Sequence, residues 1–308
     1  MYISRRSVQQ SYKRQKIITK LLFFAIGLIL VGFIFSFALF AWYAKDLPSP
    51  GKLAVVTGNS TVFYDREGKV LFEMYKDKNR VPAKFDEISD YVKKATVAIE
   101  DKSFYKHGGI SQTGILRAAI NILLRRSFEG GSTITQQLIK NVLLDARRTP
   151  SRKIKEMILA FEVERRYSKN QILEMYLNEA PYGGSYWGIA SASRGYFDKD
   201  PKDLNLLESA ILAGLPQSPT YYSPFIGKNE AWKGRAKDVL RRMREDAYIT
   251  KNQEKKALSD LEKIKFTSPH LSINAPHFVF YVKQQLIKQF GEAAVESGGL
   301  RVTTTLEY

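Results

Sequence analysis

Three polar clusters within residues 100–156 interrupt sequence that is otherwise apolar and helix-prone. They read EDKSFYKH at residues 100–107, GGSTITQQLIKN at residues 130–141 and RKIKE at residues 152–156. The first cluster joins two carboxylates to an imidazole, and the other two supply lysine and arginine. Acids beside a basic cluster suit a transfer reaction whose leaving group is anionic. The stretch therefore predicts an enzyme with a mainly helical fold.

The second cluster has the pattern of a helix start. Two glycines give the backbone freedom for a close approach, and Ser132 or Thr133 can cap the helix. Spacings of three and four place four polar residues on one face, namely Thr133, Gln136, Gln137 and Lys140. Exposed donors at a helix N-terminus, followed by a lysine, predict an anion site. In the third cluster Arg152 and Glu156 also share a face, although that pair alone is typical of a surface salt bridge.

Composition limits the classes of protein that remain. The chain has 308 residues, a net charge of +17, no cysteine and three widely spaced histidines. The absence of cysteine excludes disulfides, thiolate metal sites and a thiolate nucleophile, and the spacing of the histidines disfavours a zinc site. The positive charge indicates a polyanionic partner such as nucleic acid, anionic lipid or a phosphorylated substrate.

The N-terminal region explains part of that charge. Residues 1–20 carry six basic and no acidic side chains, and residues 21–44 form a run of 24 residues without a charge that closes on Trp42 and Tyr43. A bilayer core of about 30 Å needs roughly 20 apolar helical residues. The pattern predicts a transmembrane helix with a cytoplasmic basic tail and an extracytoplasmic remainder. The basic tail is thus explained by membrane topology. The sequence also has no zinc-finger or RNA-binding signature, so a nucleic-acid partner is disfavoured.

The rest of the chain is predicted to be largely helical. Two β-prone runs at 61–64 and 70–73 predict a hairpin. Apolar residues at three-to-four spacing predict helices at 91–100, 115–124, 133–144, 151–166, 169–178, 188–196, 206–213, 231–247, 252–263 and 278–290. The strand-like stretch 298–306 is expected to be unpaired, as if a further domain followed. The expected division is a basic tail (1–20), a transmembrane helix (21–44), a linker (45–60), a catalytic domain with the hairpin (61–247) and a linker region (248–308).

Order and spacing give the clusters a family resemblance. EDxxFxxHxG at 100–109, GSTITQQLIKN at 131–141, RKxKE at 152–156 and ILEMYLN at 172–178 resemble, in order, the motifs of the peptidoglycan glycosyltransferases of family 51. One departure is Ser111, where many members carry Asp. The flanks, including GGLRVTTTL at 298–306, resemble those of this domain in class A penicillin-binding proteins. The SxxK match at 103–106 lies inside the first motif and no KTG follows, so a transpeptidase domain is not expected here.

The resemblance implies a fold and an activity. The expected fold is mainly α, a lysozyme-like domain of two lobes with a groove between them, one N-terminal transmembrane helix and a small β element. The implied reaction polymerises lipid II onto a growing glycan chain, with inversion and release of undecaprenyl diphosphate. The implied location is the bacterial cytoplasmic membrane, with a single span. The implied partners are membrane lipids and cell-wall synthesis proteins, without nucleic acid.

The resemblance also implies roles for individual residues. Glu100 is the implied general base, with a pKa that its apolar neighbours would raise. Lys140 and Arg152 would hold the diphosphate. Glu156, the second implied catalytic acid, would support the donor site or bind a divalent metal (Mg or Mn), and no organic cofactor is implied. The groove would be lined by Ser132, Thr133, Gln136, Gln137 and Asn141. The Glu100 segment would be ordered by Asp101, Phe104 and His107, with a direct substrate contact equally open for His107.

Two other functions and one alternative structure fit parts of the pattern. A lysozyme-like or lytic glycan-cleaving enzyme could use the same glutamate, but it would have no diphosphate for Lys140 and Arg152 to bind. A catalytically idle scaffold of a wall-synthesis complex would not need the intact clusters. Residues 110–124 suit either a core helix or a lobe that dips into the membrane.

Overall fold

The structure of the chain is a computed structural model. It describes residues 19–20, 22–24, 26–28, 30–34, 42, 47–53, 60–74, 79–111, 131–144, 149–228, 230–267 and 274–308. The helix expected at 115–124, and with it the choice between core and membrane lobe, lies outside these residues, as does Gly130.

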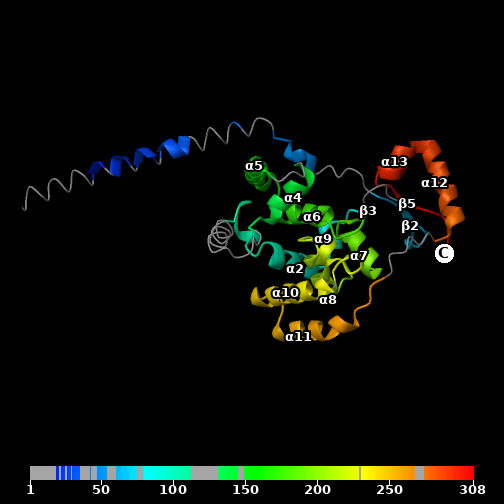
Figure 1. Ribbon diagram of the computed structural model, residues 1–308. Helices are drawn as coiled ribbons and strands as arrows, with labels where there is room; N and C mark the ends of the chain where they lie inside the picture. The colour runs from blue at the N-terminus through cyan, green and yellow to red at the C-terminus, as the bar shows by residue number, and fades with distance from the viewer. Residues whose placement is uncertain are drawn as a thin grey trace, which may run out of the picture.

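Helices form the main body (Figure 1). They are α2 (Asp90–Glu100), α4 (Ile134–Val142), α5 (Pro150–Arg166), α6 (Lys169–Glu179), α7 (Ile189–Phe197), α8 (Leu206–Gly214), α9 (Pro219–Tyr222), α10 (Ala231–Glu245) and α11 (Lys251–Asp260). Short 3₁₀ turns lie at Pro50–Leu53, Phe85–Glu87, Phe104–Lys106 and Leu261–Lys263. Helix α8, buried except at its first residue, packs against α2 and α10, while α4 packs against α5 and α6. The expected mainly helical fold is confirmed.

Side-chain caps explain where several helices begin. The oxygens of Ser89, Thr133, Thr149, Ser168 and Thr250 each accept a backbone N–H of the first turn. Such a cap satisfies a donor that the helix itself leaves free. The pattern of threonine followed by proline at 149–150 therefore marks the start of α5, and Thr133 rather than Ser132 caps α4.

A small sheet and two helices form a second apolar cluster. Strands β1 (Thr61–Tyr64) and β2 (Val70–Met74) form the expected antiparallel hairpin, and β5 (Arg301–Thr303) pairs with β1 in parallel. The helices α12 (Pro276–Phe290) and α13 (Glu292–Ser297) lie beside this sheet, away from the main helical body (Figure 1). The shared core consists of Phe63, Leu71, Met74, Val279 and Val295.

The pairing of β5 corrects one expectation and leaves another open. The strand-like end of the chain was expected to be unpaired, and that is wrong. Its partner β1 lies near the other end of the sequence, and local periodicity does not specify so distant a partner. The expected domain boundaries remain predictions.

A second, two-stranded sheet joins β3 (Asn79–Arg80) to β4 (Tyr186–Trp187) in parallel.

The predicted membrane span at 21–44 lies partly outside the described residues. Those described within it are helical, and their large apolar side chains are exposed, including Phe23, Phe24 and Phe33. Within the described ranges, no helix has the length and apolar character to cross a bilayer.

Candidate active site

Glu100 ends α2 in a largely buried position. Only 8% of its side-chain surface is exposed. The amide Nε2 of Gln137 on α4 donates to its Oε2 at 2.7 Å, and the hydroxyl of Tyr176 on α6 donates to Oε1 of Gln137 at 3.4 Å. This chain of contacts orients the amide, because its oxygen accepts from tyrosine while its nitrogen donates to the carboxylate. Three helices thus hold one carboxylate.

The second oxygen of Glu100 has a different environment. Its Oε1 is buried and accepts no hydrogen bond from the described residues, while Nη2 of Arg235 lies 3.7 Å away. Burial raises the pKa of Glu100, because it disfavours the charged form. The hydrogen bond from Gln137 and the charges of Arg235, Lys140 and Arg242 oppose that rise without cancelling it. The direction agrees with the expectation from the apolar neighbours of Glu100.

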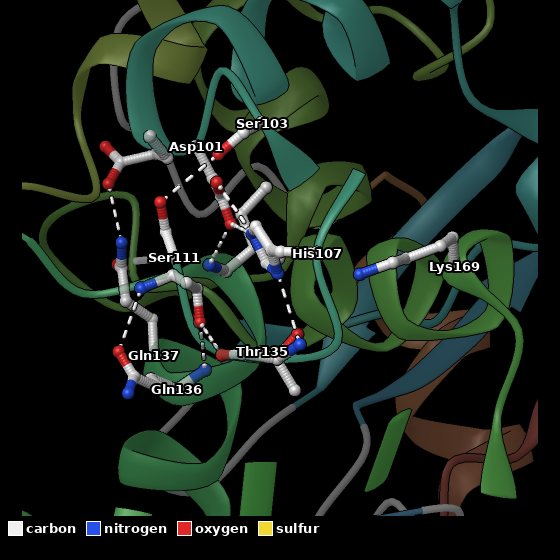
Figure 2. A network of polar contacts seen from close by, with 12 residues as sticks. Asp101, Ser103, His107, Ser111, Thr135, Gln136, Gln137 and Lys169 are labelled. Carbon is white, nitrogen blue, oxygen red and sulfur yellow. Dashed lines mark hydrogen bonds and ion pairs between the residues drawn. The ribbon is translucent and has the colours of Figure 1, made fainter. Parts of the chain in front are cut away.

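Asp101 and His107 tie the segment after Glu100 to the start of α4 (Figure 2). The backbone N–H of Gly109 donates to Nδ1 of His107 at 3.1 Å, so the ring proton lies on Nε2. That Nε2 donates to the Asp101 carboxylate, whose oxygens lie 3.0 and 2.9 Å away. Asp101 also accepts the N–H of Ile134, the first residue of α4, at 3.1 Å. Both ring nitrogens of His107 therefore have partners within the chain, which favours the ordering role over a substrate contact.

Gly109 allows this segment to approach α5 closely. Its φ is +89°, a conformation that favours glycine, and a Cβ there would lie 2.8 Å from the carbonyl oxygen of Ala160. The hydroxyl groups of Ser103 and Ser111 lie 3.3 Å apart across the same loop. Ser111, the position that departs from the family pattern, thus still makes a polar contact.

Phe104 anchors the segment from the other side. Its ring is fully buried, and Nζ of Lys169 lies 4.5 Å from the ring centroid. Lys169 also pairs with Glu164 at 2.7 Å, and the Thr135 hydroxyl donates to Glu164 at 2.6 Å. These contacts join α4, α5 and α6 behind the Glu100 segment, so Phe104 lies where the ordering role requires it.

The start of α4 differs from the expected open anion site. Thr133 and Gln136 form a reciprocal capping box, in which each side chain accepts the backbone N–H of the other. The Thr133 hydroxyl also donates to the carbonyl of Gly109 at 2.7 Å. Thr133 is 1% and Gln136 3% exposed, so the expectation of exposed donors is wrong for these two. The N-cap and third residues turn their side chains back onto the helix end, where they are buried. Of the remaining predicted groove residues, Ser132 and Asn141 are half-buried.

We expect Thr133→Val to lower the free energy of unfolding by about 1–2 kcal/mol, because a similarly shaped side chain loses the cap. A urea titration of both proteins measures the difference. Thr250→Val is the matched control, since Thr250 forms the same capping box on the more exposed α11 and should cost less. Unchanged stability together with lost activity would instead assign Thr133 to the substrate.

The third cluster is a buried glutamate held between two basic side chains at the start of α5. Nε of Arg152 lies 3.1 Å from one Glu156 oxygen, and Nζ of Lys153 lies 2.9 Å from the other. Lys153 also donates to the Ser132 hydroxyl at 2.8 Å. The Glu156 side chain is 4% exposed, which excludes an ordinary surface salt bridge. Glu156 therefore fixes the positions of two cations.

Lys140 lies on α4, the helix between the Glu100 carboxylate and the charged cluster on α5. Its side chain keeps contact with solvent, yet the protein around its ammonium group lowers its pKa by desolvation. Glu156 and Glu100 both raise that pKa, whereas Arg152 and Lys153 lower it further. Lys140 thus lies on the same helix as Gln137, which donates to Glu100, and its pKa responds to the charges of Arg152 and Glu156 on α5.

Sequence reasoning missed two residues of this site. Arg235 lies in the helix predicted at 231–247 and Tyr176 in the motif at 172–178, and neither residue had a predicted role. The signal for Arg235 was its place in the apolar stripe of α10, between Trp232 and Val239, since a charged residue on a buried stripe is unusual. Tyr176 carried no comparable signal.

Comparison with known proteins identifies the family of the chain. The family model described as Transglycosylase matches residues 67–244, more than half of the chain. The chain belongs to this family. This is the family of peptidoglycan glycosyltransferases that the motifs predicted.

Three similar proteins show how much of a longer chain is covered. Penicillin-binding protein 1A of Vibrio cholerae is 33% identical over 294 residues, covering 95% of this chain and 35% of that protein. Its namesake in Escherichia coli is 34% identical over 293 residues, covering 94% and 34%. A crystal structure of penicillin-binding protein 1A from Haemophilus influenzae is 23% identical with a TM-score of 0.44, covering 82% and 28%. The chain spans about a third of the length of the two sequence relatives.

Proposed function

We propose that this chain polymerises lipid II. The acceptor sugar loses the proton of its 4-hydroxyl to Glu100, and its oxygen attacks the anomeric carbon of the donor. The bond from that carbon to the diphosphate breaks, and its electron pair leaves with undecaprenyl diphosphate. The supporting observation is that Gln137 on α4 donates to the buried Glu100 at 2.7 Å, while Lys140 one turn along the same helix lies near enough to the Arg152–Glu156 pair for their charges to shift its pKa. A proton acceptor and an anion site thus lie together.

The environment of Glu100 suits a general base. A base works best when its pKa approaches the working pH, and burial raises the pKa of Glu100 in that direction. Gln137 already donates to Oε2, whereas Oε1 accepts no hydrogen bond from the described residues, so Oε1 is the better placed of the two to accept the proton. Tyr176 supports Gln137 from behind and remains a neutral donor, since burial raises its own pKa well above the ordinary value.

The cations on α4 and α5 suit a departing diphosphate. Negative charge grows on the diphosphate as the bond breaks, so fixed positive charge stabilises the transition state more than the ground state. Arg152 can bind phosphate through two N–H groups, and Lys140 acts as a point charge. Glu156 would act by positioning Arg152 and Lys153.

A divalent metal at Glu156 remains a prediction that this geometry does not favour. Both carboxylate oxygens already contact cations, Arg152 and Lys153. In the described part of the chain, no cluster of three or more His, Asp or Glu side chains could hold a metal ion.

The membrane setting belongs to the same proposal. Lipid II is held in the membrane by its undecaprenyl chain, so an enzyme anchored by residues 21–44 would meet its substrate at the outer face of the cytoplasmic membrane. The α2, α4 and α5 surfaces around Glu100 and Lys140 would line the groove of a lysozyme-like domain with two lobes. Membrane lipids and cell-wall synthesis proteins are the proposed partners.

The direct test is incubation of the purified protein with labelled lipid II, followed by separation of the products by length. Polymer of increasing length supports the proposal. If the protein makes no polymer but shortens pre-made glycan, it is a glycan-cleaving enzyme instead.

The pH dependence of kcat/KM should show the state of Glu100. A protonated carboxyl cannot accept the acceptor's proton, so activity should rise with pH through the pKa of Glu100. Because burial raises that pKa above 4.5, the midpoint of the rise should also lie above 4.5. Initial rates at low lipid II concentration between about pH 4 and pH 8 measure it. A rate already at its plateau at pH 4.5 would contradict a buried base.

A further inference from the structure

Arg235 reaches Glu100 from outside all of the motif clusters. Its Nη2 lies 3.7 Å from Oε1 of Glu100, and its side chain is 12% exposed. Two further contacts fix the guanidinium: its Nε donates to the carbonyl of Gly214 at 3.3 Å, and its central carbon lies 5.8 Å from the ring centroid of Tyr222. Gly214 also makes room for the side chain, because a Cβ there would lie 2.8 Å from Cγ of Arg235.

The geometry at Oε1 separates charge stabilisation from hydrogen bonding. Gln137 donates to Oε2, whereas Oε1 accepts no hydrogen bond from any residue the structure describes. A guanidinium 3.7 Å away attracts the negative charge without occupying a lone pair. Oε1 is thus held beside a positive charge, and no described residue occupies the lone pairs with which it would accept a proton.

We propose that Arg235 is a positioning residue that acts through Glu100, keeping the carboxylate turned so that Oε1 receives the proton of the acceptor hydroxyl. This inference rests on the proposed role of Glu100 as the base. It gives α10 a part in the reaction, although α10 lies outside the three polar clusters. The end of α8 supports Arg235 from behind.

Of the cations around Glu100, Arg235 has the largest effect on the pKa of that carboxylate. The groups that face Glu100 come from α4, α6, the segment after α6, and α10; they are Gln137, Lys140, Tyr176, Tyr182, Arg235 and Arg242. Among the cations, Arg235 lowers the pKa of Glu100 most, followed by Lys140 and then Arg242. Loss of the Arg235 charge should therefore raise the pKa of Glu100.

The first measurement is the pH profile of kcat/KM for Arg235→Met and Arg235→Lys. The Met variant should move the midpoint of the acid limb to higher pH by about one unit or more, the size expected for loss of an opposite charge at this distance. Arg235→Lys keeps the positive charge, so its midpoint should lie close to that of the wild type. Arg241→Met is the matched control: the same change on α10 at an exposed arginine paired with Asp238 and Glu245, where the midpoint should not move.

A second variant disturbs Arg235 without removing it. Gly214→Ala places a methyl group against Cγ of Arg235 and should shift the midpoint in the same direction by a smaller amount. If Arg235→Met does not fold, Gly214→Ala still measures the effect of Arg235 on the midpoint. An unchanged midpoint in the folded variants, with a higher KM for lipid II, would overturn the inference and assign Arg235 to the substrate.

A titration of Glu100 itself separates this inference from the proposed function. The ¹³C carboxyl signal of Glu100, assigned by its loss in Glu100→Gln, should titrate at higher pH in Arg235→Met. If that signal does not move while Glu100→Gln is inactive, the proposed function stands and the inference on Arg235 fails. If the signal moves but Glu100→Gln still polymerises lipid II, Arg235 does act on Glu100, but the inference fails together with the base role it serves.

Discussion

Glu100→Gln should lower kcat for lipid II polymerisation by about 10²–10⁴-fold, the usual contribution of a positioned general base. Glutamine has nearly the same shape but does not accept the proton of the acceptor hydroxyl. The measurement is the initial rate of polymer formation by purified wild type and variant at one pH on the plateau of the wild-type profile.

Two controls make that result specific to the chemistry. The variant should keep the unfolding temperature of the wild type within a few degrees, since the substitution preserves volume. Glu162→Gln makes the same change on α5 at a half-exposed carboxylate and should keep full activity. Full activity of Glu100→Gln would show that another group accepts the proton.

Lys140→Met should lower kcat by about 10²–10³-fold, similar to the loss of one group that stabilises developing negative charge. The effect should appear in kcat as well as in KM, because the charge on the diphosphate grows in the transition state. Because the Lys140 charge also lowers the pKa of Glu100, its loss should move the acid limb of the pH profile upwards. Steady-state rates over a range of lipid II concentrations and pH values measure both effects.

The controls for Lys140 separate charge from shape. Lys140→Arg keeps the positive charge and should retain more activity than Lys140→Met. Lys251→Met removes an exposed lysine at the start of α11 and should leave the rate unchanged. If Lys140→Met keeps the wild-type kcat and raises only KM, Lys140 binds the substrate equally in the ground and transition states.

The helices and the membership of the family could be predicted because both depend on local pattern. Apolar spacing and caps such as Thr149 locate α5 within a residue or two, and long motifs in a set order identify the enzyme class. The pairing of Thr133 with Gln136 was also readable as a capping box, which would have shown that both residues are buried at the helix start.

Contacts between distant segments could not be predicted in the same way. Arg235 approaches Glu100 because α2, α8 and α10 pack against one another, and β5 pairs with β1, a strand far from it in the sequence. The apolar periodicity of α10 or of β5 does not specify the segment against which each one packs. The same reason explains why Tyr176 was quoted in a motif without its contact to Gln137.

The central claim is that one site takes the proton from the acceptor and stabilises the departing diphosphate. The most direct measurement counts undecaprenyl diphosphate released against glycosidic bonds formed, using lipid II labelled in both the sugar and the lipid. We predict one diphosphate released for each bond formed by the wild type, and neither product from Glu100→Gln. Release of diphosphate without a new glycosidic bond, or bond formation at the wild-type rate by Glu100→Gln, would contradict the claim.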